Sequence, residues 1–484
     1  MNKRRLFSLI LAGLLSAPVL VSCAEEHGNT GEKDYQSSTP DTAAETDKYD
    51  AARSCYEEIP DVDYEGGDYT IVAQQNVGSS ETEIWVEKMD AQPVNDAVYT
   101  RNSRVGERFN CKIALKAGDV SSIIRQSVTS GDEVYKLAFP SLESAAAMAQ
   151  AGWFLNYLDC DAINIRAPWW DQGTADLEIG GKVYFMCGDI NILDNDVTYI
   201  LLFNKKMIAD QGMDEPYQLV RDQKWTIDCF GEMIKDVTDD SNGDGKFTDA
   251  DTYGYVTTGE GPNTFFYGSG LKLVSFDSDK LPMLDINASK ISDLLEKMKV
   301  IFTENNSTRI PGNYSIGSKM FTEDRVLFYG EVLSYVINLR EMETPFGVLP
   351  IPKYDDAQED YITYCESNAS AVGIPMMTTE PDKVTAVLEA LAIQSYLNLT
   401  PAYYDISLQR KYARDDESAE MLDIALAHRV YDIGRIYSSL GIKYVFGDLA
   451  RAGSTDFASA WAKKQKAASR MLDKIANSFY EMSY

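Results

Sequence analysis

The clearest apolar pattern in the chain is the run VTYILLF at residues 197–203. It is apolar almost without a break and rich in β-branched and aromatic side chains, which is typical of a strand buried on both faces. The polar loop before it contains Asp189, Asp194 and Asp196, and the residues after it, KKMIADQG, have the pattern of a short helix. A new α/β unit is therefore predicted to begin here.

Upstream of this run, short apolar stretches alternate with amphipathic ones. YTIVA (69–73), CKIALKA (111–117) and YKLAF (135–139) are predicted strands, and the residues between and after them have helical spacing. This alternation predicts a parallel, doubly wound sheet, in which ligands bind beyond the carboxyl ends of the strands. The loops at those ends supply the candidate ligand-binding residues Gln75, Asn76, Ser141 and Glu143.

The N-terminus has the features of an export signal. Basic residues at 3–5 precede an apolar run from Leu6 to Val21, and LVSC at residues 20–23 is similar to a bacterial lipobox. We therefore expect residues 1–22 to be removed and Cys23 to carry a lipid. An ordinary signal peptide with an incidental cysteine is the competing interpretation. Residues 23–62 are polar and acidic, which predicts a flexible tether.

Charge and cysteine content exclude several classes of partner and site. Without the signal the chain keeps 42 basic and 75 acidic residues, a net charge of −33, so nucleic acid and anionic lipid are poor partners. Solubility explains the acidity without invoking any ligand. Six cysteines follow Cys23, and export permits 15 different pairings, none of which the sequence selects. Their scatter lacks the spacing of a zinc site.

The stretch DSNGDGKFTDAD at residues 240–251 matches a calcium-binding loop of the EF-hand type. Gly245 stands at the sharp turn, and Phe247 is expected to anchor the loop to the core. Asp replaces the usual Glu at the last position, which predicts weaker binding, and a solvated polar turn is the alternative. The candidate ligands of a structural Ca²⁺ are Asp240, Asn242, Asp244, the carbonyl of Lys246, Thr248 and Asp251.

Paired tryptophans at positions 169 and 170 are a second local feature. Trp169 or Trp170 could offer a flat face to the C–H side of a sugar ring, with Asp171 near its hydroxyl groups. Packing in the core is the competing interpretation, because tryptophan is bulky and is often largely buried.

Several longer stretches resemble the family 1 extracellular solute-binding proteins, the carbohydrate-type binding lipoproteins of ABC importers. VTYILLFNKKMIADQGM, the helix start WTIDCFGEMIKDV, the strand ending at Glu331 and FGVLPIPKYDD carry the resemblance. Asp324 departs from the family pattern, where a glycine is usual. The resemblance implies an α/β fold of two lobes, each a mainly parallel sheet flanked by helices, joined by a hinge of several strands.

The resemblance also implies domain limits, a site and partners. Lobe I would comprise residues 63–190 and 335–373, and lobe II residues 191–334 and 374–484, including the helical stretches after residue 382. The saccharide would lie between the lobes, and an ABC permease would take it from a monomer anchored by lipid outside the cytoplasm. Residues carried over as ligand contacts are Asn263, Phe265, Tyr267 and Glu331.

Catalysis is the main competing class of function. Only His27 and His428 are present, and His27 lies in the predicted tether, so a histidine-dependent hydrolase is hard to assemble. A lipid-anchored glycoside hydrolase needs only two carboxylates and stays open. We expect a binding protein rather than an enzyme. A peptide ligand is the other alternative, and Arg166 or Arg340 could bind a uronic acid.

Overall fold

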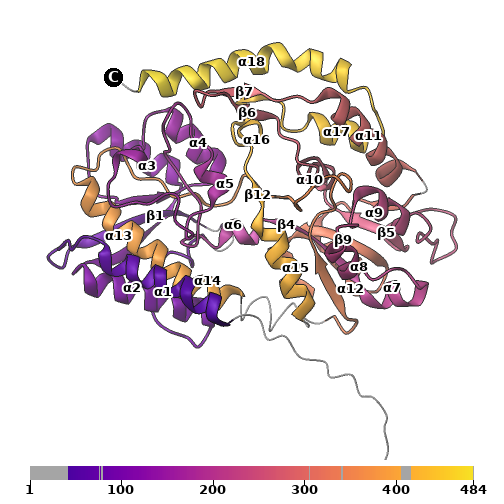
Figure 1. Cartoon of the computed structure of the whole chain (residues 1–484), viewed down its shortest axis with the longest axis horizontal. Helices are drawn as coiled ribbons and strands as arrows, with labels where there is room; N and C mark the ends of the chain where they lie inside the picture. Colours follow the sequence, from indigo (N-terminus) through magenta and orange to yellow (C-terminus); the bar gives the residue numbers. More distant parts are fainter. Residues whose placement is uncertain are drawn as a thin grey trace, which may run out of the picture. The chain divides into compact units, whose positions relative to one another are not determined.

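The computed structural model describes residues 42–75, 77, 80–304, 306–339, 342–404 and 416–482. The chain divides into two compact units, Met1–Asp47 and Lys48–Tyr484. The second unit contains two main sheets with helices packed on their faces (Figure 1). We call the part built on the first sheet the first lobe (residues 48–190 and 370–397) and the part built on the second sheet the second lobe (residues 191–369 and 416–482).

The first sheet has the order β2-β1-β3 and is parallel. Successive side chains of β1 point to opposite faces, as in any strand. Tyr69, Ile71 and Ala73 pack with α2 and α13, whereas Val72 packs with α3 and α4. The elements of this lobe are β1 (Asp68–Gln74), α2 (Pro93–Arg108), β2 (Lys112–Gly118), α3 (Val120–Ser130), β3 (Leu137–Phe139), α4 (Leu142–Gln150), η1 (Tyr157–Asp159), α5 (Gln172–Ala175) and α13 (Pro381–Gln394).

The second sheet has the order β10-β4-β9-β5-β8. It is mixed, because β5 pairs in parallel with β8 and β9, whereas β4 pairs antiparallel with β9 and β10. Strand β4 covers Tyr199–Asn204 and is buried along its whole length, so the strand predicted from VTYILLF is confirmed. The other strands are β5 (Tyr253–Thr257), β8 (Thr308–Arg309), β9 (Val326–Val332) and β10 (Phe346–Leu349).

Helices cover both faces of the second sheet. Phe230 and Leu294 pack on the face of β4 that carries Leu201, and Phe321 and Leu422 pack on the face that carries Leu202. The helices are α6 (Leu193–Asp196), α7 (Lys205–Gln211), α8 (Pro216–Arg221), α9 (Ile227–Ile234), α10 (Gly261–Gly268), α11 (Ala288–Thr303), α12 (Tyr314–Thr322), η2 (Leu333–Leu339), α15 (Asp416–Ala427), α16 (Ile433–Ile436), η5 (Ser438–Leu440), α17 (Val445–Arg451) and α18 (Phe457–Glu481). The α/β class and the two-lobed arrangement predicted from the sequence are thus confirmed.

Two neighbouring antiparallel segments pass from one sheet to the other. Residues 186–199 and 365–373 are joined by bridges at Met186↔Val372 and Thr198↔Cys365, and Gly373 then pairs with Ala138 of β3. Glu83, from the first lobe, caps α6 at this crossing, because its carboxylate accepts the N–H groups of Ile192 and Leu193. The crossing is therefore a packed and hydrogen-bonded part of the molecule.

The structure corrects three predicted placements. Strand β10 pairs with β4 in the second sheet, not with the first. Helix α13 packs in the core of the first lobe, where the Tyr69 hydroxyl donates to the Val384 carbonyl at 2.8 Å, although the sequence analysis placed it in the second. Apolar patterning alone does not identify the sheet that receives such an element.

The third correction concerns the end of the predicted tether. Helix α1 covers Thr42–Glu58, and its Ala52 is buried in the core of the first lobe together with Ile59. The Tyr49 ring lies 5.6 Å from that of Tyr396. Residues 23–41 of the predicted tether, including Cys23, lie outside the described residues. No helix in the described ranges is long and apolar enough to cross a membrane.

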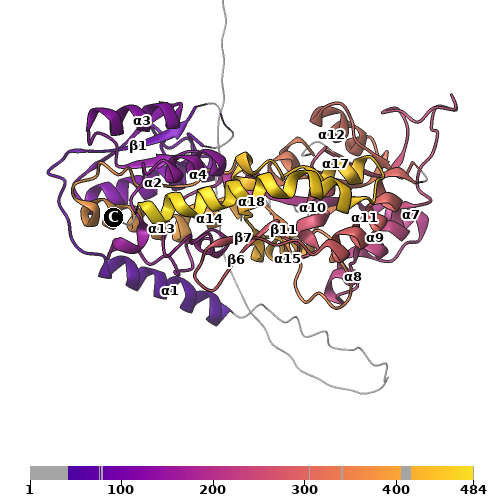
Figure 2. The same ribbon diagram turned by 90° about the horizontal axis from the view of Figure 1, so that it is seen from above.

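Helix α18 spans the two lobes (Figures 1 and 2). It contacts α11 and α17 of the second lobe and α4 of the first. The hairpin formed by β6 (Val274–Phe276) and β7 (Pro282–Leu284) lies below it. Two shorter strands, β11 (Thr363–Tyr364) and β12 (Arg429–Val430), pair in parallel near the middle of the molecule.

Candidate functional site

A pocket of the second lobe lies where β5 and β9 end. It has about 180 Å³ of space for water and is walled by the residues after β5, the start of α12 and the end of β9. Because the carboxyl ends of neighbouring parallel strands meet at one edge of a sheet, their loops enclose a ligand-sized hollow there. The lining residues are Thr257, Thr258, Gly259, Pro311, Gly312, Asn313, Tyr314, Gly317, Tyr329 and Glu331.

Glu331, a predicted ligand contact, lies in the wall of this pocket. Its side chain is buried, with one oxygen accepting the Val332 N–H at 2.9 Å and the other 3.4 Å from the Tyr329 hydroxyl. Burial raises the pKa of Glu331 to about 7, against the lowering effect of these two hydrogen bonds, and the nearby charge of Glu366 raises it further. A polar ligand group in the pocket could donate a hydrogen bond to this carboxyl.

Tyr314 supplies an open aromatic face in the same pocket. It is 54% exposed, and its ring centroid lies 5.4 Å from that of Tyr335. Asn313 holds it in place, because its side chain caps α12 by accepting the N–H of Ile316 at 3.1 Å. The sequence analysis missed Tyr314. The signal was present, since an asparagine cap directly before an aromatic residue fixes that residue at a helix start.

A group of charged and aromatic side chains borders this pocket. Glu366 accepts the hydroxyl groups of Tyr199 and Tyr364 at 3.0 and 3.1 Å, and Tyr199 also lies 3.4 Å from Thr258 in the pocket wall. The buried guanidinium of Arg435 bonds Glu260 at 2.8 Å and lies 3.6 Å from Glu366. Two carboxyl groups, of Glu260 and Glu366, are thus near one guanidinium, and Glu331 is close enough to Glu366 to be affected by its charge.

A second pocket, with about 450 Å³ of space for water, lies between α3, α4 and the residues after Glu366. It contains Ser141 and Glu143, both predicted from the end of the third strand. Ser141 caps α4, and Glu143 pairs with Lys443 of the second lobe at 3.4 Å. Ser367 and Asn368 of the crossing segment line this pocket, together with residues 436–439 of the second lobe. The ligand-binding role of these residues stays a prediction.

The other predicted ligand contacts lie elsewhere. The indole N–H groups of Trp169 and Trp170 donate to the two oxygens of Glu389 at 2.9 and 3.0 Å, and both rings are buried in the first lobe. These tryptophans are therefore core residues in this structure. Gln75 is exposed, outside the lining of either pocket, and Asn76 lies outside the described residues.

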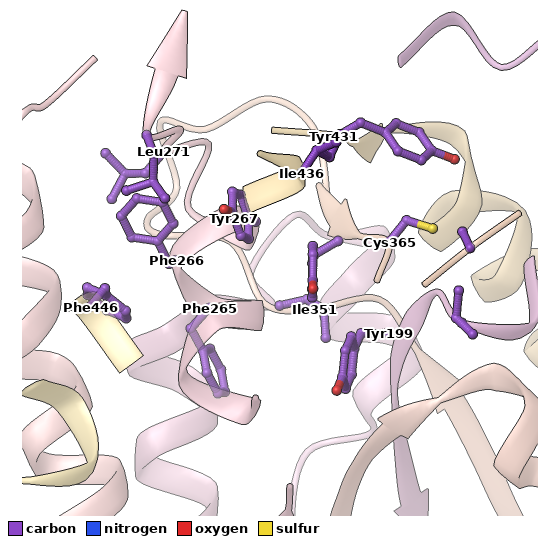
Figure 3. Close-up of a cluster of buried hydrophobic side chains, with 14 of the residues drawn as sticks. Tyr199, Phe265, Phe266, Tyr267, Leu271, Ile351, Cys365, Tyr431, Ile436 and Phe446 are labelled. Atoms are coloured by element: carbon purple, nitrogen blue, oxygen red, sulfur yellow. The ribbon is translucent and has the colours of Figure 1, made fainter. Parts of the chain in front are cut away.

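The aromatic residues of α10 are also buried. Phe265 is 0% exposed and Tyr267 1%, and Figure 3 shows them within the apolar cluster beside Tyr199. The Tyr267 hydroxyl bonds Asp432, and Asn263 donates to Glu260 at 2.7 Å. Asn263 thus contacts Glu260 in the charged group beside the first pocket, whereas the rings of Phe265 and Tyr267 pack in the core.

The predicted calcium loop lies at the surface of the second lobe. Asp240 accepts the N–H groups of Asp244 and Gly245 at 3.2 and 2.7 Å, and Gly245 has a φ of +77°, as its turn position requires. Phe247 is 42% exposed, so the expected anchor in the core is wrong. One oxygen of Asp251 is buried without a partner, which leaves an acceptor for a cation.

The candidate oxygen ligands of this loop do not form a closed coordination sphere. Among the described residues, no three His, Cys, Asp or Glu side chains form a group that could hold a metal ion. The expected set also draws on Asn242, Thr248 and the Lys246 carbonyl, and hard oxygen donors of this kind are suited to Ca²⁺. The six cysteines from Cys55 to Cys365 are free thiols.

Comparison with solved structures assigns the fold to that of ABC substrate-binding proteins. The chain resembles Lmo0181 of Listeria monocytogenes in complex with cycloalternan, with 12% identity and a TM-score of 0.56, covering 84% of this chain and 99% of that one. It also resembles a cyclo/maltodextrin-binding protein complexed with maltotetraose, with 11% identity and a TM-score of 0.55, covering 86% and 97%.

A third likeness is to a solute-binding protein of Thermotoga lettingae bound with α-D-tagatose. Its identity is 15% and its TM-score 0.51, and 85% of this chain and 99% of that chain are covered. No protein-family model matches the sequence, and no curated protein matches it. At these identities the likeness defines the fold, and the ligand has to be argued from the pockets.

Proposed function

We propose that this protein is an extracytoplasmic solute-binding protein that captures a saccharide between its lobes and delivers it to an ABC permease. The observation that carries the proposal is the pocket of the second lobe, in which the open ring of Tyr314 faces the same hollow as the carboxyl of Glu331. An aromatic face suits the C–H side of a sugar ring, and a carboxyl suits its hydroxyl groups. The saccharides named for similar structures support this choice.

A neutral saccharide fits this pocket better than an acidic one. The carboxyl groups of Glu260, Glu331 and Glu366 outnumber the guanidinium groups of Arg435 and Arg451, and Arg451 is already paired with Asp448, so a uronate would meet more like charge than opposite charge. Arg166, one candidate for binding a uronate, pairs instead with Asp176 at 2.7 Å on the surface. Arg340, the other candidate, lies outside the described residues.

Binding without chemical change is the central test. The protein is titrated calorimetrically with maltotetraose, a uronic acid oligomer and a tripeptide, and the recovered ligand is analysed by mass spectrometry. Saturable binding of maltotetraose, recovered intact, is the expected outcome. New reducing ends would favour a glycoside hydrolase, and binding of the tripeptide alone would favour a peptide-binding protein of the same fold.

Tyr314→Ala locates the site. Loss of one stacking ring is expected to weaken saccharide binding by about 1–2 kcal/mol, which is roughly 5- to 30-fold in Kd. Tyr480→Ala, at an exposed tyrosine of α18 outside both pockets, is the matched control and should leave Kd unchanged. Equal affinity in both variants would place the ligand elsewhere.

The remaining elements of the proposal concern the ion and the anchor. The loop from Asp240 to Asp251 binds Ca²⁺, with the orphaned oxygen of Asp251 as one ligand. When free Ca²⁺ is present at about a hundred times its Kd, binding stabilises the folded protein by about 2.7 kcal/mol, so a chelator should lower Tm. Asp244→Asn should abolish that chelator effect, whereas Asp236→Asn, outside the loop, should keep it.

Cys23 carries a lipid, which mass spectrometry of the membrane fraction tests.

A further inference from the structure

Helix α18 is held at its N-terminal end by the second lobe. Asp456 caps it by accepting the N–H of Ser459 at 3.1 Å. The rings of Phe457 and Trp461 are stacked, with centroids 5.9 Å apart and an angle of 12° between their planes. Both side chains are buried, and the helix packs on α11 and α17 there. This end is therefore a fixed attachment.

The other end of α18 is attached to the first lobe. The Phe479 ring lies 5.4 Å from the Tyr184 ring, and the Phe479 carbonyl accepts a hydrogen bond from the Lys182 ammonium at 2.9 Å. Met482 packs at the edge of the same core, beside Gly152. A 25-residue helix is about 37 Å long, so a single rigid element reaches from one lobe to the other.

The junction beneath the C-terminal turns is apolar and closely packed. The hollow there has only about 10 Å³ of space for water, which is room for at most one molecule. Its walls come from both lobes, with Ile179 and Phe185 on one side and Ile436 and Tyr437 on the other. The Tyr437 hydroxyl is buried without a partner. Water entering on separation would satisfy it, which lowers the cost of opening this junction.

A hairpin adds a second attachment near the same helix. The carbonyl of Lys280, between β6 and β7, accepts the N–H of Gly180 at 3.0 Å, and the Lys280 ammonium lies 3.9 Å from Glu178. In Figure 1 the hairpin of β6 and β7 lies above α6. The chain crossings and the Arg429–Asp171 and Lys443–Glu143 pairs also join the lobes. The contacts of α18 and of the hairpin can break without unfolding either sheet.

We propose that α18 is a strap that limits how far the two lobes can separate, and that its C-terminal turns must leave Tyr184 and Lys182 before the lobes open fully. The inference rests on the proposed function only in that opening would admit the saccharide. Separation of rigid lobes about a hinge is a common transition in two-lobed binding proteins. Here the helix would set its amplitude.

The test is small-angle scattering of the full chain without any ligand. Lys182→Met with Phe479→Ala removes the hydrogen bond and the ring contact, and should raise the radius of gyration by roughly 1 Å from the value of about 23 Å expected for a compact chain of this size. Asn477→Ala, exposed on the same turn, is the matched control and should change nothing. An unchanged radius in the double variant would overturn the proposal.

A milder variant guards against misfolding. Lys182→Met alone keeps the aliphatic stem and should expand the molecule less, in the same direction, with an unchanged circular dichroism spectrum. No expansion in this folded variant, together with unchanged amide exchange in the last turns of α18, would likewise contradict the strap. Because no saccharide is added, failure here is separate from failure of saccharide binding, which the calorimetric titration reports.

Discussion

Glu389 allows a quantitative test of how the first lobe is held together. Its carboxyl lies between Trp169 and Trp170 and accepts both indole N–H groups. Burial raises its pKa from 4.5 to about 7, against the lowering effect of those two donors. The native state therefore holds the proton more tightly than the unfolded chain does. The contribution to stability is complete below pH 4.5 and is lost as pH rises through 7.

The size of the effect follows from the two pKa values. Each unit of difference between the native and unfolded pKa values corresponds to about 1.36 kcal/mol. As the pH rises from 4.5 through 7, the titration of Glu389 therefore lowers the free energy of unfolding by about 3 kcal/mol. Glu389→Gln removes the titration but leaves one indole N–H facing an amide NH₂, which costs about 1–3 kcal/mol. The variant should thus be less stable than the parent at pH 4.5. Between pH 4.5 and pH 8 the parent loses about 3 kcal/mol of stability that the variant does not lose, so the variant gains about 3 kcal/mol relative to the parent.

Urea unfolding at pH 4.5, 6 and 8, followed by tryptophan fluorescence and circular dichroism, measures this difference. Other buried acids titrate in both proteins and cancel in the comparison. Glu359→Gln, at an exposed position, is the control and should differ little from the parent. A gap between Glu389→Gln and the parent that stays constant across the three pH values would refute the reasoning.

Two further predictions concern packing and buried charge. Gly347→Ala would place a methyl group 2.2 Å from both the Phe203 ring and the Tyr217 hydroxyl. We expect this variant to lose about 1–3 kcal/mol or more in free energy of unfolding, measured with urea. Gly312→Ala, which has open space around it, should be near neutral. Arg429→Met leaves the buried carboxylates of Asp171 and Asp194 without a countercharge, so it should lower the free energy of unfolding by about 3–5 kcal/mol. Arg221 pairs with Glu417 and Glu420, which are exposed. Arg221→Met should therefore cost less than about 1 kcal/mol by the same assay.

The sequence predicted local structure well where the pattern had a single physical interpretation. A run of apolar β-branched and aromatic residues produced β4, and Thr226 capped α9 as the helix start at WTIDCFGEMIKDV implied. The same information could not assign β10 to a sheet, because a strand buried on both faces fits either lobe. Helix α13 was misplaced for the same reason, since nearly all its residues are buried and no polar face marks its orientation.

The candidate site was harder to predict for a different reason. Ser141 and Glu143 were predicted because they follow a strand directly and strand ends meet at one edge of a sheet, whereas Glu331, which lies within β9, was predicted from the family resemblance. The tryptophan pair was ambiguous, because its partner Glu389 lies more than two hundred residues away in the chain. Tyr314 was missed because the only sequence signal for it is the cap residue Asn313, since a single exposed aromatic ring has no periodicity.

The packing of α1 has a consequence for where this protein can work. If Cys23 is the point of lipid attachment, only 25 residues separate it from Tyr49, the start of the packed part of α1. Even a fully extended chain of that length reaches no more than about 90 Å. The folded part would then remain within a few molecular diameters of the bilayer, where its search for a membrane-embedded partner is confined to a thin layer.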